Sequence, residues 1–269
     1  MQYFLGIDIG TYESKGVLTD KEGDVIASAT HPHKMLVPEP GWAEHRPEED
    51  WWNDFVKITK KILKASKINP DDISCIATSA IGPCMLPVSY EGDPLMNAVL
   101  YGVDTRAEKE IEELNEEVGE EKILQNCGNA LTSQSVGPKI LWLKKNCPEI
   151  YKKAHKILSS TSYLVQKLTD ESVIDHYTAA NFTPLYDIKN LKWTDALTKN
   201  IIEIERLPKL KWTTEIAGYV SKVASKETGL ATGTPVTVGT IDAAAEAISV
   251  GVCSAGDMMM MYGSTTVSY

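Results

Sequence analysis

The first polar stretch of the sequence, residues 10–15, lies between two apolar runs that are typical of buried strands. Asp8 precedes it, at a strand end where a carboxylate can hold a metal ion such as Mg²⁺ through water. Gly10 lets a phosphate approach the backbone because it has no side chain, and successive N–H groups in such a turn can bind an anion. The stretch also adds two hydroxyls and one positive charge, on Thr11, Ser14 and Lys15. These residues fit a phosphate-binding loop, and they fit equally an ordinary hairpin with a polar turn.

Two further aspartates stand where an element is expected to begin. Asp242 follows the β-branched run Pro235–Val238 and precedes an Ala-rich helix expected over residues 243–250. A carboxylate at a strand-to-helix junction can act as a base, or it can merely cap the helix. Asp104 precedes an acidic helix expected to begin near Thr105, so it too is a good N-cap.

The elements that must position these residues alternate between strands and helices. Three strands at residues 3–9, 17–18 and 25–29 are joined by tight turns, which predicts an antiparallel meander. Pro47 suits the first position of a helix whose apolar residues recur at helical spacing from Trp51 to Leu63. A buried strand is expected at 73–78, and a strand pair at 85–88 and 98–101. This alternation predicts a sheet covered by helices on both faces.

The middle and the end of the chain have different patterns. Residues 119–210 are expected to be helical with irregular connections. Residues 258–262 and 266–269 are expected to pair as a hairpin across Gly263 and Ser264, so that Gly263, Ser264 and Thr265 repeat the pattern of the first polar turn. We expect this apolar hairpin to be covered by another part of the protein or by another chain, since an isolated hairpin is marginally stable in water.

Composition excludes several classes of protein. The 269 residues are 43% hydrophobic and 24% charged, with a formal net charge of −10, which argues against a nucleic-acid surface. No apolar run is long enough to span a membrane, and no signal peptide is expected, because a strand is expected almost at the first residue. Five scattered cysteines fit free thiols in a reducing cytoplasm. His31 and His33 resemble half of a metal site, but no third ligand lies nearby in the sequence, so a solvated loop is expected.

Asp-x-Gly-Thr between two strands resembles the first phosphate loop of the ATPases that include actin, hexokinase and the heat-shock chaperones. The rest of the chain is similar to the FGGY family of carbohydrate kinases, segment by segment and in the family's order. The segments are GWAEHRPEEDWW (41–52), LYGVDTRA (100–107), PKILWLKKNCPEIY (138–151), LSSTSYLVQKLT (158–169), GLATGTPVTVGTIDAAAEAISVG (229–251) and GDMMMMYGSTTVSY (256–269).

The resemblance implies a fold and roles for the residues. The fold is an α/β, ribonuclease H-like (actin-like ATPase) domain over residues 1–255, with residues 256–269 opening a second such domain that binds ATP. Asp242 is implied as the base that takes a proton from the sugar hydroxyl, and Asp8 as the Mg²⁺ site. The phosphates of ATP are assigned to Gly10, Thr11, Ser14, Lys15, Gly263, Ser264 and Thr265, and the substrate to Gly82, Pro83, Asp104, Arg106 and Asp242.

The implied reaction is ATP-dependent phosphorylation of a small sugar or polyol in the cytoplasm. Gly82 and Pro83 stand where xylulose kinases of the family have Met-His and glycerol kinases have Arg-Glu, so the substrate stays open. Tyr177, Asn181 and Tyr186 are unranked candidates for sugar contact. The chain alone is expected to be inactive without the remainder of the second domain or a chain that supplies it. Whether the protein forms a homodimer is left open. The alternatives are a chaperone-like or filament-like ATPase and a non-catalytic sugar-binding or regulatory half-protein.

Overall fold

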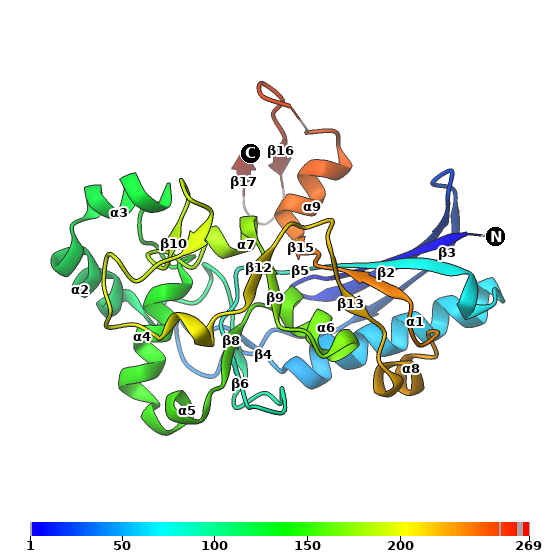
Figure 1. Ribbon diagram of the computed structural model, residues 1–269, viewed down its shortest axis with the longest axis horizontal. Coiled ribbons are helices and arrows are strands. Elements are labelled where there is room, and N and C mark those ends of the chain that lie inside the picture. The colour runs from blue at the N-terminus through cyan, green and yellow to red at the C-terminus, as the bar shows by residue number, and fades with distance from the viewer. Residues whose placement is uncertain (1, 253, 263–265, 269) are drawn as a thin grey trace.

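The computed structural model describes residues 2–252, 254–262 and 266–268. Its main element is a mixed sheet in the order β13-β14-β5-β1-β2-β3 (Figure 1). Strand β15 follows β14 along β5 and also pairs with β5. These strands are β1 (Tyr3–Ile9), β2 (Glu13–Asp20), β3 (Val25–Pro32), β5 (Ile73–Ala80), β13 (Ile216–Tyr219), β14 (Pro235–Thr237) and β15 (Thr240–Ile241). The first three form the expected antiparallel meander, whereas β5 runs parallel to β1, β14 and β15.

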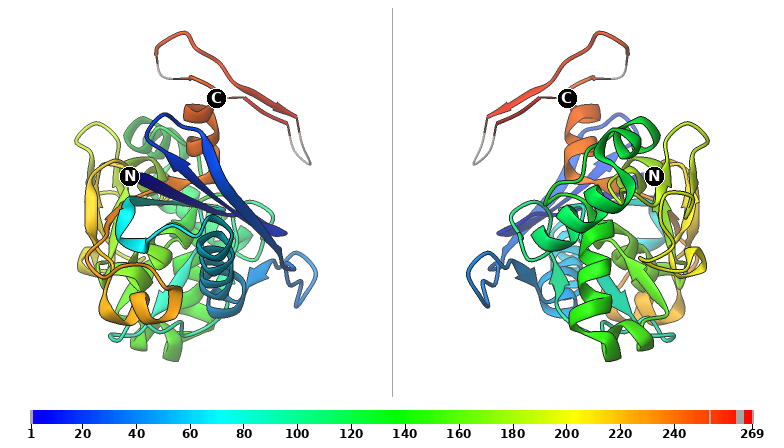
Figure 2. Two further views of the ribbon diagram at one scale, coloured as in Figure 1. Left: turned by 90° about the vertical axis from the view of Figure 1, so that its right-hand side faces the viewer. Right: turned by 90° about the vertical axis from the view of Figure 1, so that its left-hand side faces the viewer.

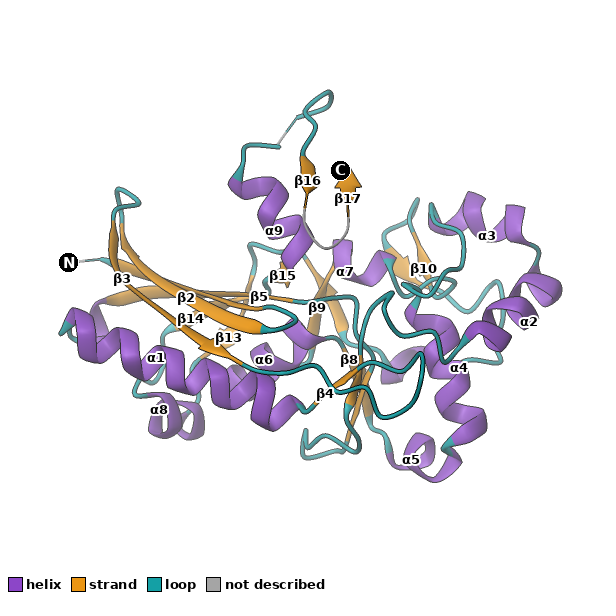
Figure 3. Ribbon diagram, turned by 180° about the vertical axis from the view of Figure 1, so that it is seen from behind, coloured by secondary structure: helices purple, strands orange, loops and turns teal. Residues whose placement is uncertain are grey.

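Helices cover both faces of this sheet, as predicted. Seen from behind, α1 (Asn53–Ser66), α6 (Ser160–Thr169) and α8 (Lys222–Thr228) lie on one face and α9 (Asp242–Ser249) on the other (Figure 3). A π-helical turn, Pro47–Trp52, leads into α1 and has Pro47 at its start. Helix α1 ends at Lys67, which adopts a left-handed conformation and donates its N–H to the Leu63 carbonyl.

The remaining elements form a second helical region at one end of the sheet (Figure 1). Its helices are α2 (Glu108–Val118), α3 (Glu120–Cys127), α4 (Val136–Asn146), α5 (Pro148–Lys153) and α7 (His176–Ala180). The short strands are β4 (Glu44–His45), β6 (Leu86–Val88), β7 (Ala98–Val99), β8 (Lys156–Leu158), β9 (Val173–Asp175), β10 (Tyr186–Asp187), β11 (Lys192–Trp193) and β12 (Lys209–Lys211). Short 3₁₀ turns lie at Pro70–Asp72 and Ile204–Arg206. The helices of this region surround a second apolar core, whereas residues of the short strands such as Leu86, Leu158 and Val173 belong to the core beneath the sheet.

The structure corrects two predicted elements. The strands expected to pair at 85–88 and 98–101 share only the Met85–Val99 bridge. Instead, β6 pairs with β8 and β7 pairs with β4, so each strand pairs with a strand that is distant in the sequence. The acidic helix begins at Glu108, with Ala107 and not Asp104 at its N-cap, because Asp104 is committed to other contacts described below.

The described part of the tail forms the expected hairpin, in which β16 (Met260–Tyr262) pairs antiparallel with β17 (Thr266–Ser268). It extends away from the sheet (Figure 2), and Met258 and Met260 are exposed. Among the described residues, no helix combines the length and apolar composition that a bilayer crossing demands. The described cysteines Cys75, Cys84, Cys127 and Cys147 are free thiols.

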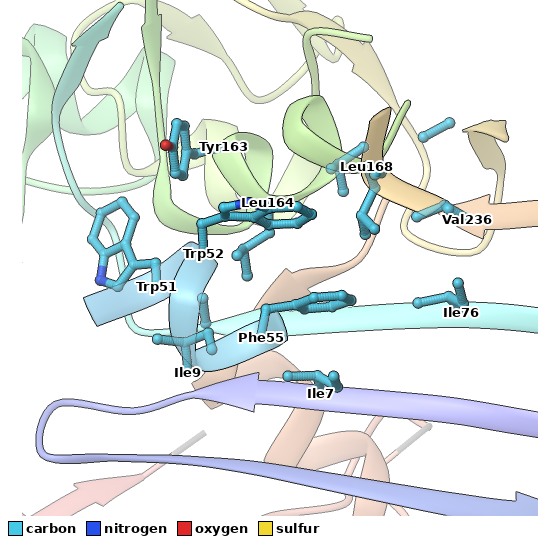
Figure 4. Close-up of a cluster of buried hydrophobic side chains, with 14 of the residues drawn as sticks. Ile7, Ile9, Trp51, Trp52, Phe55, Ile76, Tyr163, Leu164, Leu168 and Val236 are labelled. Atoms are coloured by element: carbon cyan, nitrogen blue, oxygen red, sulfur yellow. The ribbon is translucent and has the colours of Figure 1, made fainter. Parts of the chain in front are cut away.

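The core beneath the sheet is built where α1 and α6 meet the strands (Figure 4). Phe55 stacks on Trp52, with ring centroids 5.5 Å apart, between strand residues such as Ile7 and α6 residues such as Leu164. Strand β2 approaches α1 closely because Gly16 has no side chain there. A Cβ at Gly16 would overlap Cγ2 of Ile58 and lie 3.0 Å from Ile62.

We expect Gly16→Ala to lower the free energy of unfolding by about 1–3 kcal/mol, since the added methyl group must displace α1 from the sheet. Gly6→Ala is the matched control: it lies on the other face of the same sheet, and its Cβ would meet Val17 at 3.6 Å. That variant should change stability by less than about 0.5 kcal/mol. Urea denaturation of both variants measures the difference, and equal effects would refute this account of the packing.

Candidate active site at the carboxyl ends of the parallel strands

Three parallel strands end side by side and bring distant residues of the chain together. Asp8 at the end of β1 is in register with Ser79 of β5, and Ser79 is in register with Thr240 of β15. Asp242 follows directly where β15 ends and α9 begins. Ligands of α/β proteins bind preferentially at the carboxyl ends of parallel strands, so this edge is the first candidate for a site.

Asp8 points to the face of the sheet opposite α1. Neighbouring side chains alternate between faces, so Leu5, Ile7 and Ile9 are buried against the α1 side while Asp8 is half-buried on the other. The Ser79 hydroxyl donates to its carboxylate at 2.6 Å, an interaction that the sequence did not reveal. Lys15 lies opposite Asp8 across the β1–β2 pair, on the same face.

A cavity of about 560 Å³ lies between this face and α9. Its lining includes Asp8, Lys15, Ser79, Thr240, Ala245 and Ile248. Asp242 does not line it but begins the helix that covers it. The described residues contain no cluster of three His, Cys, Asp or Glu side chains arranged to hold a metal. A cation here would therefore depend on one or two carboxylates and on oxygens from water or a ligand, which is a donor set that suits Mg²⁺.

Asp242 has the perturbed chemistry expected of a functional carboxyl group. Burial raises its pKa to about 7; the Ala243 N–H, which donates to Oδ1 at 2.8 Å, opposes the shift, while Asp8 and Glu246 add to it by charge repulsion. The N-cap position of α9 is Ile241, so Asp242 is the first helical residue and does not cap the helix from outside. A carboxyl group with this pKa can accept a proton at neutral pH.

The backbone around Asp242 is fixed by residues that sequence analysis missed. Thr161 of α6 donates its hydroxyl to the Thr240 carbonyl at 2.9 Å, and Thr240 donates its own hydroxyl to Asp175 at 3.0 Å. Asp175 also caps α7 by accepting the Thr178 N–H. The spacing of Asp175 and Thr178 indicates a cap in the sequence, but its link to β15 appears only in the fold. Gly82 packs against Ile241, where a Cβ would overlap that side chain.

The loop between β1 and β2 has the conformation that its glycine suggested. Gly10 N–H donates to the Glu13 carbonyl at 3.1 Å, and a Cβ at Gly10 would lie only 2.8 Å from that oxygen. Thr11 connects this loop to the segment 100–107, because its hydroxyl lies 3.2 Å from the Tyr101 hydroxyl. The exposed Lys15, which follows this loop, is paired with Asp8 across the two strands.

Ser14 does not join this group. It is fully buried on the α1 side, and its hydroxyl donates to Asp54 at 2.9 Å. The reason is the strand alternation: Ser14 pairs with Ile9, one position away from the Asp8–Lys15 pair, and so faces the opposite side of the sheet. We therefore remove Ser14 from the predicted phosphate ligands.

The structure also encloses Asp104 and Arg106. Their side chains form a 2.8 Å ion pair with no exposed surface, and Arg106 adds a 2.9 Å ion pair to Glu44. The Asp104 carboxylate accepts the Ala43 N–H as well, at 2.7 Å. With the Asp104 oxygens occupied in this way, that carboxylate supports the loop 100–107 from within, and we do not retain it among the groups that contact a sugar. Arg106 Nη1 is buried with no hydrogen-bond partner among the described residues, so the substrate contact of Arg106 stays a prediction.

The other predicted residues are placed as follows. Gly82 is partly exposed and Pro83 is buried, both directly after β5. Tyr186 is buried, with its hydroxyl 2.7 Å from His176 Nδ1, so it belongs to the core. Tyr177 is 43% exposed, and Asn181 donates its side-chain amide to the Tyr177 carbonyl. The second predicted phosphate loop, Gly263, Ser264 and Thr265, lies outside the described residues.

Comparison with known proteins identifies this architecture. Residues 3–249 match the model of the FGGY family of carbohydrate kinases, N-terminal domain. Glycerol kinase of Thermococcus gammatolerans is 32% identical over 227 residues, which cover 82% of this chain and 45% of that protein. Xylulose kinase of Escherichia coli K12 is 28% identical over 267 residues, 99% of this chain and 54% of that protein.

Solved structures agree with this result. The crystal structure of xylulose kinase from Rhodospirillum rubrum superimposes with a TM-score of 0.91 at 27% identity, covering 97% of this chain and 53% of that one. Plasmodium falciparum glycerol kinase with ADP gives 0.88 at 26% identity, covering 99% and 53%. The chain thus spans about half the length of the relatives it matches, with an actin-like ATPase fold. The chain belongs to the FGGY family of carbohydrate kinases, as its N-terminal domain.

Proposed function

We propose that this chain is the sugar-binding and catalytic half of an ATP-dependent kinase that phosphorylates a hydroxyl of a small sugar or polyol. The observation that carries the proposal is the half-buried Asp242 carboxyl, whose pKa is raised to about 7 beside Asp8 at the end of the parallel strands. Names of similar proteins, glycerol kinase and xylulose kinase, support a polyol or a ketopentose as substrate.

In the proposed reaction, Asp242 accepts the proton of the attacking hydroxyl. Such a general base contributes a factor of roughly 10²–10⁴ to the rate. Asp8, oriented by Ser79, would hold Mg²⁺ through water, and the cation would supply neutralisation of phosphate charge. Thr11 offers its backbone N–H and Lys15 one positive charge to the phosphates of ATP, and Gly10, which has no side chain, lets a phosphate approach the loop. Gly82, which packs against Ile241, and its neighbour Pro83 would lie at the sugar side.

We further propose that residues 256–269 open a second domain that completes the ATP site, with Gly263, Ser264 and Thr265 in its phosphate loop. The family model ends at residue 249, close to this boundary. The remaining half would come from the rest of the protein or from another chain. Free cysteines are consistent with a cytoplasmic enzyme.

The first test is Asp242→Asn in the protein that includes this second half. We expect kcat to fall by two to four orders of magnitude, with the KM for ATP nearly unchanged, because only the transition state needs the base. A coupled kinase assay over glycerol, xylulose and related sugars and polyols measures both. Asp195→Asn, the same chemical change at an exposed carboxylate outside α9, is the matched control and should retain activity. Wild-type turnover in the Asn variant would assign the base elsewhere.

The second test uses the pH dependence of stability. Burial raises the pKa of Asp242 to about 7 in the folded protein, against about 4 when unfolded, so the folded state binds this proton more tightly. Wild-type stability should therefore fall as pH rises from about 4 to about 7, whereas Asp242→Asn has no such loss. Thermal melts should show the variant gaining about 1–3 kcal/mol relative to wild type across this range. The exposed Asp195→Asn is the control; a gain that is independent of pH would contradict the buried-charge explanation.

A further inference from the structure

The backbone carbonyls of the loop between β1 and β2 are held by two histidines. His33 Nε2 lies 3.0 Å from the Gly10 carbonyl, and His45 Nε2 lies 3.1 Å from the Thr11 carbonyl. The backbone N–H of His33 donates to the next carbonyl, that of Tyr12, at 2.9 Å. Three consecutive carbonyls of this loop are therefore fixed by donors from the segment that follows β3 and from β4.

This arrangement determines where the loop N–H groups point. In a trans peptide the C=O and N–H bonds of one peptide unit point in opposite directions. Because the Gly10 and Thr11 carbonyls face the histidines, the N–H groups of Thr11 and Tyr12 face away from them. Within the described residues, no acceptor is recorded for either N–H. Successive backbone N–H groups in a turn can bind an anion, and this loop offers two that point in a fixed direction.

The hydrogen-bond network sets the protonation of His45. Trp51 Nε1, which can only donate, lies 3.0 Å from His45 Nδ1, so Nδ1 must be the acceptor. The hydrogen of the neutral ring is then on Nε2, which donates to the Thr11 carbonyl. Burial, with the neighbouring His33 as the next cause, lowers the pKa of His45 to about 4, which keeps this neutral form at physiological pH.

His33 is oriented by a buried carboxylate. Its Nδ1 lies 2.9 Å from Oδ2 of Asp54 on α1, and the side chains of His33 and Asp54 are 3% and 1% exposed. Asp54 also receives the Ser14 hydroxyl at 2.9 Å, while His31 Nδ1 lies 3.0 Å and Lys57 Nζ 3.9 Å from its other oxygen. Both ring nitrogens of His33 thus face hydrogen-bond acceptors. The expectation of a solvated loop at His31 and His33 is wrong, because α1 supplies the partner.

We propose that His33 and His45 are positioning residues, which aim the Thr11 and Tyr12 N–H groups at a bound phosphate group. Neither histidine touches the anion; each acts through the carbonyl on the far side of a peptide unit. The inference rests on the proposed function only in identifying that anion as a phosphate of ATP. Binding of a simpler anion to the loop does not depend on the proposed function.

The test compares two amide substitutions at each histidine, because a Gln amide reaches the position of Nε2 and an Asn amide that of Nδ1. His33→Gln and His45→Gln keep a donor for the loop carbonyl, whereas His33→Asn and His45→Asn remove it. Inorganic pyrophosphate is titrated into the 269-residue chain, and the ¹⁵N–¹H signals of Thr11 and Tyr12 are followed by NMR. Thermal melts of each variant verify folding.

We expect pyrophosphate to shift both amide signals in the wild type. The Asn variants should bind about fivefold more weakly, as for loss of one hydrogen bond, while the Gln variants should stay within about twofold of wild type. His155→Asn, at an exposed histidine far from this loop in sequence, is the control and should bind as wild type.

Three results would overturn the proposal: unshifted Thr11 and Tyr12 signals in the wild type, wild-type affinity in the Asn variants, or affinities that follow thermal stability regardless of whether Gln or Asn is present. The proposed function fails by a different result, which is that no sugar or polyol is phosphorylated. Pyrophosphate shifts with rescue by Gln would support the positioning role even then.

Discussion

The parallel pairing of β5 with β1 and with β15 is the constraint on which the rest of this structure depends. It places Asp8, Ser79 and Thr240 in one row across three strands, and therefore sets Asp242 at the same edge of the sheet. Parallel neighbours require long crossover connections. Strands β2 and β3 and helix α1 lie between β1 and β5, and helices α2 to α8 lie between β5 and β15. Burial at this edge raises the pKa of Asp242 toward neutrality, and the charge of Asp8 adds to the shift.

The loops around this edge are held by buried polar groups rather than by apolar packing. Arg106 is enclosed between Asp104 and Glu44, with its guanidinium 4.0 Å from the ring centroid of Trp42. Lys139, almost fully buried, donates to the carbonyls of Leu100 and Tyr101. Burial of a charged group is costly unless it is paired, and each of these two side chains has acceptors in the interior. These contacts therefore specify one conformation of the segment 100–107, which lies against Thr11 of the first loop.

The two faces of the sheet have different tasks. The α1 face is apolar and closely packed, and Gly16 is needed there because α1 comes so near to β2. The other face presents Asp8, Lys15 and the cavity beneath α9. Successive side chains of a strand face opposite sides of the sheet, so the adjacent residues Ser14 and Lys15 have different roles. Ser14 joins Asp54 and His33 inside, where that network supports the loop backbone.

Local patterns in the sequence were sufficient for the meander, the start of the first helix at Pro47, the glycine turn at Gly10 and the Asp242 helix, because each depends on neighbours along the chain. The family resemblance added the order of the segments. Only the tertiary structure decided that Asp104 and Arg106 form an ion pair in the interior, that Ser14 faces α1, and that β6 and β7 pair with distant strands. It also decided that His33 finds Asp54. Each of these depends on which residues meet across the fold, and side-chain type and spacing along the chain do not contain that information.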